Sequence, residues 1–143
     1  MNSFELSYTI ELASEAVWQK FFNELHHWWT ADFYTSPRTQ SFQIKTELGG
    51  KMYEDFGNGE GLVWGEVIGV DKPKSLQVKG MLSGEFGGPA ISYEKYIFEK
   101  ENKNTRFTYR VEFIGNVNEK TLKSLESGWK TIFTDYFIPY CNK

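Results

Sequence analysis

The segment NEKTLKSLESGWKTIFTDYFIPY, residues 118–140, places apolar side chains at intervals of three and four residues. This spacing predicts one long amphipathic helix, with Asn118 as its N-cap and Pro139 near its end. At ~1.5 Å per residue the helix would be on the order of 30 Å long, enough to cross a whole domain. Gly128 lowers helix stability by ~1 kcal/mol relative to Ala, which suggests close packing of the helix on a strand at this point. The apolar stripe consists of Leu122, Leu125, Trp129, Ile132, Phe133 and Phe137.

Upstream of this helix the pattern predicts a strand, a pair of short helices and then about six more strands. Residues 4–12 alternate between apolar and polar side chains, which is typical of a half-buried strand. Ser14 is the expected N-cap of a helix that ends near Leu25, and HHWWTADF continues as a second short helix or a turn. From residue 41 to residue 114, alternating segments are separated by turn signals such as Asn58-Gly59, which predicts an antiparallel meander. This order of elements predicts an α+β fold, with the helices on one side of the sheet.

Length and composition limit the classes of function. The 143 residues are expected to form one domain over residues 1–143. A net charge of −3 and dispersed basic residues argue against nucleic acid as a partner. No apolar run approaches the ~20 residues of a membrane helix, and residues 1–14 lack the pattern of a signal peptide. With Cys141 as the single cysteine, these features indicate a soluble cytoplasmic protein. The aromatic content of 17% suits either a hydrophobic pocket or a Phe-rich core.

Three stretches of the sequence resemble the START-like (SRPBCC) superfamily: AVWQKFFNELHHWW after the first strand, LGGKMYEDFGNGEGLVWGEVIGVDKPKSL in the meander, and SGWKTIFTDYF in the last helix. More narrowly, these stretches resemble the family named after the C-terminal domain of the activator of 90-kDa heat-shock protein ATPase. The resemblance extends from Phe4 to Phe137. It implies a helix-grip fold, in which a curved sheet of about seven strands wraps around the C-terminal helix and leaves an internal ligand cavity. It implies no single chemistry, because the superfamily contains carriers, cyclases, hydrolases and protein-binding domains.

The segment LHHWWTAD, residues 25–32, raises the question of a metal site. His26 and His27 are adjacent, so on a helix they point about 100° apart and cannot chelate one ion together. The sequence has no H-E-x-x-H motif, no third histidine and no second cysteine, so we expect no metal and no cofactor. Trp28 and Trp29 are instead interpreted as the wall and lid of a cavity, because two adjacent indoles cannot both enter one core face.

The hairpin of residues 90–114 supplies a candidate polar group for such a cavity. A tight turn at ENKN pairs Phe98 with Phe107 and sets Tyr96 opposite Tyr109. The same register turns Glu94 toward the apolar inner face, where a carboxylate is costly to bury or takes up a proton. A register slip of one residue would send this side chain outward.

A second carboxyl group follows the same pattern on an earlier strand. Met52, Glu54 and Phe56 share one face, so Glu54 is expected to point inward as well. The alternative for both Glu54 and Glu94 is a place near a strand end, in water or paired with a basic side chain.

Three functions remain open from the sequence, and the first is favoured. It is the binding of a small hydrophobic, aromatic or lipid-like ligand between the sheet and the C-terminal helix, with Glu94 or Glu54 as the polar anchor. The expected wall of the cavity consists of Trp28, Trp29, Phe33, Met52, Trp64, Tyr96, Tyr109, Trp129 and Phe133.

The two alternatives use the same fold differently. A cyclase- or hydrolase-type enzyme would use Glu94 or Glu54 as general acid or base, with Tyr109 or Tyr96 orienting a carbonyl group. A protein-interaction domain related to the chaperone activator would bind a protein partner, or a second copy of itself, through its surface. Such a domain is expected to show an exposed apolar patch and a filled interior.

Overall fold

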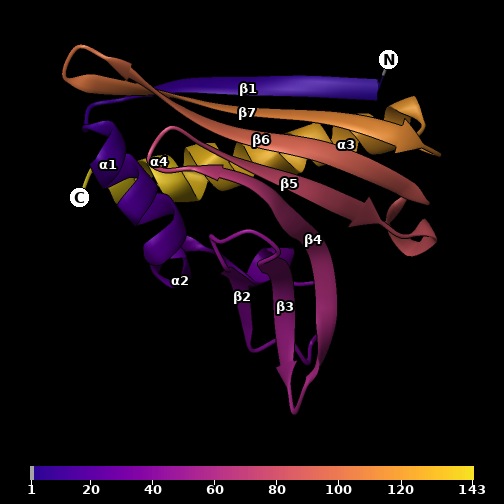
Figure 1. Cartoon of the computed structure of the whole chain (residues 1–143). Helices are drawn as coiled ribbons and strands as arrows, with labels where there is room; N and C mark the ends of the chain where they lie inside the picture. The colour runs from indigo at the N-terminus through magenta and orange to yellow at the C-terminus, as the bar shows by residue number, and fades with distance from the viewer. Residues whose placement is uncertain (1) are drawn as a thin grey trace.

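The computed structural model describes residues 2–143, which form one seven-stranded antiparallel sheet and a long C-terminal helix (Figure 1). The strand order is β1-β7-β6-β5-β4-β3-β2, so the first strand pairs with the last one. This architecture confirms the expected α+β class and the meander that follows the first strand. The strands are β1 (Asn2–Ile10), β2 (Ser41–Ile44), β3 (Lys51–Gly57), β4 (Glu60–Asp71), β5 (Ser75–Leu82), β6 (Ala90–Glu101) and β7 (Asn104–Gly115).

The long C-terminal helix lies on the inner side of this curved sheet. Figure 1 shows the C-terminal helix running beneath β5–β7, with α1 near its C-terminal end, while β2 and β3 form an arm that curves away from the other strands. None of the helices in residues 2–143 is long and apolar enough to cross a membrane. The helical segments are α1 (Ser14–Trp18), η1 (Gln19–Asn23), α2 (Leu25–Trp28), η2 (Ala31–Phe33), η3 (Gly84–Phe86), α3 (Glu119–Thr131), η4 (Ile132–Phe137) and α4 (Ile138–Cys141).

Of the two helix N-caps expected from the sequence, Asn118 and Ser14, the structure confirms Asn118. The Oδ1 atom of Asn118 accepts a hydrogen bond from the amide of Thr121 at 2.8 Å, as an N-cap residue does. Ser14 was expected to cap the first helix, but Ala13 occupies that position and Ser14 is the first residue of α1. The reason is a tertiary contact, because the Ser14 hydroxyl lies 3.1 Å from Oγ1 of Thr105 on β7.

The predicted continuous helix contains a turn of a different kind. The segments α3, η4 and α4 follow one another without a break, but η4 is π-helical. A π-helical turn accommodates an extra residue per turn, and here Ile132, Phe133 and Phe137 are all buried. Apolar spacing alone does not distinguish this local widening from a regular α-helix.

The β6–β7 hairpin has the register that the sequence predicts. Phe98 pairs with Phe107, Tyr96 with Tyr109, and Glu94 therefore lies on the inner face of the sheet. The turn at Glu101–Asn104 fixes this register, with Asn102 at a φ of 58°. At the end of the hairpin opposite to this turn, the outer face of the sheet exposes a strip of apolar side chains in cross-strand register, namely Met81, Ile91 and Ile114.

Candidate functional site

A cavity of about 270 Å³ lies between the inner face of the sheet, the middle of α3 and the two turns η2 and η3. Its rim carries Val63, Met81 and Phe86, which are 40%, 54% and 42% exposed, so the cavity opens to solvent on this side. Its walls are mostly apolar and include two indole rings, those of Trp64 and Trp129. A concave, apolar site with a few polar groups is the usual form of a small-molecule site.

Glu94 is the ionisable centre of this cavity. Its Oε1 atom accepts a hydrogen bond from the Tyr109 hydroxyl at 2.6 Å, and its Oε2 atom accepts one from the Ser92 hydroxyl at 2.9 Å. Glu94 lies deep in the fold and keeps part of its surface open to the cavity. Burial raises the pKa of Glu94, and the hydrogen bonds from Tyr109 and Ser92 lower it by less. Burial, followed by the charge of Glu94, raises the pKa of Tyr109 well above its ordinary value, so Tyr109 remains a neutral donor.

A glycine makes the space that this carboxyl group occupies. Gly80 on β5 lies on the inner face, and a Cβ atom added there would stand 2.1 Å from Ser92 Oγ and 2.2 Å from Glu94 Oε2. Every larger residue would therefore displace the Glu94 side chain or the Ser92 hydroxyl. Neither Gly80 nor Ser92 was among the site residues expected from the sequence. A glycine in the interior of a strand was the available signal, because it often marks a close approach of another group.

Glu54 has a different place and a different set of partners. It is fully buried, and the cavity lining, as described for residues 2–143, does not include it. Its Oε1 atom accepts from the Thr35 amide at 2.9 Å and from the Thr39 hydroxyl at 2.6 Å. Its Oε2 atom accepts from the indole N–H of Trp64 at 2.8 Å. Glu54 thus ties the segment between η2 and β2 to the strands that carry the cavity wall.

Five of the nine residues expected to form the wall line the cavity, together with Glu94. Four expected residues lie in layers behind the wall. Trp29 stacks on Phe42 at 4.2 Å between ring centroids and meets the edges of Trp64 and Trp129. The expected residues in the lining are Phe33, Met52, Trp64, Tyr109 and Trp129.

Trp28 departs furthest from the expected lid position. It is 4% exposed, its ring packs on Phe21 and Phe137, and its indole N–H donates to the carbonyl of Lys20 at 2.9 Å. Because α2 ends at Trp28, the chain turns there, and the two adjacent indoles pack in different layers. Trp28 is therefore a core residue.

The other two expected wall residues are also core residues. Tyr96 packs behind Tyr109 with 5.1 Å between ring centroids, and its hydroxyl has no hydrogen-bond partner within residues 2–143. Phe133 packs on Tyr109 and Trp129 from η4. The lining also includes residues that were not expected in the cavity wall, among them Ser92, Phe113 and Leu125.

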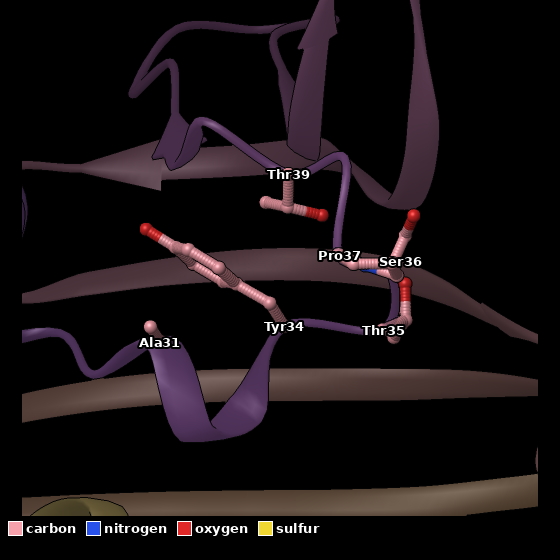
Figure 2. Close-up of a pocket in the computed structure, with 6 residues that line it drawn as sticks. All are labelled: Ala31, Tyr34, Thr35, Ser36, Pro37 and Thr39. Carbon is pink, nitrogen blue, oxygen red and sulfur yellow. The ribbon is translucent and has the colours of Figure 1, made fainter.

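A second hollow, shown in Figure 2, lies on the surface of the segment that Glu54 holds. Its volume is about 400 Å³, and it is wide and shallow. Ala31 and Tyr34 form one side, and the chain returns along the other side at Ser36, Pro37 and Thr39. The Thr39 hydroxyl is already hydrogen-bonded to Glu54. We therefore consider the internal cavity the stronger candidate site.

The two histidines lie outside both hollows. His26 and His27 are exposed on α2, with their ring centroids 4.0 Å apart. Within residues 2–143 no three His, Cys, Asp or Glu side chains lie close enough together to hold a metal ion.

The fold is shared with solved structures of low sequence identity. CalU16 from Micromonospora echinospora is 15% identical with a TM-score of 0.66, and the alignment covers 97% of this chain and 74% of CalU16. DynU16, from the dynemicin biosynthetic locus, is 14% identical with a TM-score of 0.73, and this chain spans 48% of its length. Aha1 from Colwellia psychrerythraea, solved as a dimer, is 13% identical with a TM-score of 0.68 over 94% of this chain and 92% of that one.

This chain shares the helix-grip fold of these proteins, a curved antiparallel sheet around a long C-terminal helix. The expected fold is thereby confirmed, and identities of this size say nothing further about activity. No protein-family model matches the chain, and no curated protein sequence matches it.

Proposed function

We propose that this protein binds a small, largely apolar aromatic ligand in the cavity between the sheet and α3, with Glu94 as its polar anchor. The observation that carries the proposal is an open cavity with indole walls and one hydrogen-bonded carboxyl group at its inner end. A volume of about 270 Å³ lies just below the usual range of roughly 300–1,000 Å³ for ligand pockets. This size favours a ligand of one to three aromatic rings over a long lipid.

The presence of the cavity also favours ligand binding over a function as an interaction domain. The strip of Met81, Ile91 and Ile114 offers an exposed apolar patch, as an interaction domain would. The interior, however, is not filled. An unfilled apolar space is destabilising for a domain that uses only its surface, because the lining atoms lose contacts.

A dye titration tests the proposal. N-phenyl-1-naphthylamine is neutral, carries two aromatic groups and fluoresces strongly in apolar sites, so its own emission reports binding. We expect saturable binding to the wild-type protein and at least about tenfold weaker binding to Leu125→Trp, whose side chain fills the cavity from α3. Ser124→Trp is the matched control, because Ser124 is exposed on the same helix. Equal binding by all three proteins would place the dye on the surface and refute the proposal.

The second candidate is an enzyme that uses the same cavity. It is favoured by one observation, a carboxyl group of raised pKa in contact with a neutral tyrosine hydroxyl, which is a common arrangement for general acid–base chemistry. The Glu94→Gln variant distinguishes the two functions. An enzyme loses turnover in this variant and retains its substrate affinity, whereas a binding module shows no turnover in either form.

A further inference from the structure

The inner end of the cavity offers hydrogen-bond acceptors and few donors. The hydroxyl groups of Tyr109 and Ser92 each have one hydrogen, and each hydrogen is directed at Glu94. A carboxylate can accept about four hydrogen bonds, of which these two are made. The groups that remain free to meet a ligand are therefore lone pairs, on the Glu94 carboxylate and on the two hydroxyl oxygens.

The walls contain no positive charge that would offset this excess of hydrogen-bond acceptors. Within residues 2–143 no Lys, Arg or His side chain lines the cavity. An anionic ligand would therefore meet Glu94 without a counter-charge, in a place where apolar walls reduce screening by water. A ligand with a carboxylate pays for desolvation at this site and gains no ion pair.

We infer that the polar end of the ligand is a hydrogen-bond donor, above all a protonated amine, and that the cavity rejects the carboxylate of the same skeleton. This inference rests on the proposed function, because it names the class of ligand for the same cavity. An ammonium group complements the negative charge of the Glu94 carboxylate and donates hydrogen bonds to it. The aromatic part of such a ligand would pack against the indole walls of Trp64 and Trp129.

Four naphthalenes that differ at one substituent test the inference on the wild-type protein. They are 1-naphthylmethylamine, 1-naphthalenemethanol, 1-methylnaphthalene and 1-naphthoate, and calorimetry or displacement of the dye gives their Kd values. We expect the amine to bind on the order of tenfold or more tightly than 1-methylnaphthalene, with the alcohol between them. We expect 1-naphthoate to bind on the order of tenfold more weakly than 1-methylnaphthalene.

The outcomes separate the inference from the proposed function. If 1-methylnaphthalene binds and Leu125→Trp abolishes its binding, but the amine gains nothing over it, the inference is overturned and the proposed function stands. If 1-naphthoate binds best, the inference is likewise overturned. If none of the four compounds binds, the proposed function itself fails for aromatic ligands of this size.

The Glu94→Gln variant provides an internal control. It removes the charge and keeps the size of the side chain, so we expect the ratio of Kd values between 1-methylnaphthalene and the amine to fall toward one. The wild-type series remains decisive if the variant does not fold, because the four compounds differ only at the group that meets Glu94.

The preference for the amine is also expected to depend on pH. Around Glu94, β7 contributes Tyr109 and β6 contributes Tyr96 and the uncharged Ser92. The uncharged Gly80 of β5 and the uncharged Trp129 of α3 complete its surroundings. Burial raises the pKa of both tyrosines well above the ordinary value, so Glu94 is the group of this cluster that changes charge under mild conditions. The advantage of the amine should shrink as the pH falls through the raised pKa of Glu94. A preference that stays constant through this range would show that another group recognises the amine.

Discussion

The two inward-facing carboxyl groups differ in the kind of donor that each one accepts from. Two of the donors to Glu54 are N–H groups, the amide of Thr35 and the indole of Trp64, and an N–H group cannot reverse its direction. The donors to Glu94 are both hydroxyl groups, which can rotate and accept a hydrogen bond instead. A change from carboxylate to amide therefore has different consequences at the two positions.

Glu54→Gln is expected to lower the free energy of unfolding by about 1–3 kcal/mol, because the new amide N–H₂ would face an N–H donor and leave it unpaired. Glu94→Gln is the matched control and should cost less, since its partners can adapt. Urea unfolding followed by far-UV circular dichroism measures both losses. Equal losses for the two variants would mean that the geometry of the donors does not decide the cost.

Among the elements, the sequence predicts most reliably those whose register is set by a local turn. The turn at Glu101–Asn104 pins the β6–β7 hairpin, so counting along two strands was sufficient to place Glu94 on the inner face. The same alternation correctly placed Glu54 inside, on β3. In both cases the prediction needed only neighbours along the chain or across one hairpin.

The cavity lining could be predicted only in part, because it depends on how distant elements meet. Trp28 and Trp29 are adjacent in sequence, but the end of α2 separates their directions, and nothing in the local pattern shows where that helix ends. Ser92 and Gly80 lie on neighbouring strands, and their role follows from a contact with Glu94 that is visible only in three dimensions. Leu125 lines the cavity because η3 and the sheet leave space beside α3.

The glycine in α3 gives a prediction about this helix as an element. Its expected role was close packing on a strand, but a Cβ atom added at Gly128 meets only the ring of Phe33, at 3.8 Å, which is an ordinary contact. Gly128→Ala should therefore raise the free energy of unfolding by about 1 kcal/mol, through helix propensity. Asn118→Ala, which removes the N-cap of the same helix, should lower it by about 1 kcal/mol. A loss of stability in Gly128→Ala, measured by urea unfolding, would reveal a steric role for the glycine.

For the whole molecule, the cavity combines two features that do not favour stability. Its apolar walls leave contacts unmade, and its inner end holds a carboxyl group whose charged form is disfavoured by burial. A fold selected for stability alone would fill the space and replace Glu94 by an apolar residue. Departures of this kind from local rules are expected at functional sites, and here both departures occur at the same place.

This arrangement predicts how stability depends on pH. Because the pKa of Glu94 is raised above its ordinary value of 4.5, the folded protein retains this proton at pH values where the unfolded chain has released it. The stabilisation associated with the proton is thus fully present below about 4.5 and is lost as the pH rises through the raised pKa. Glu94→Gln cannot titrate there, so the stability of the wild-type protein relative to the variant should fall with rising pH across this window and then level off. Thermal or urea unfolding of both proteins over a pH series measures the difference between their unfolding free energies. The contributions of the other titrating groups cancel in this difference. A difference that increases with pH would mean that hydrogen bonds from Tyr109 and Ser92 stabilise the charged form more than burial disfavours it.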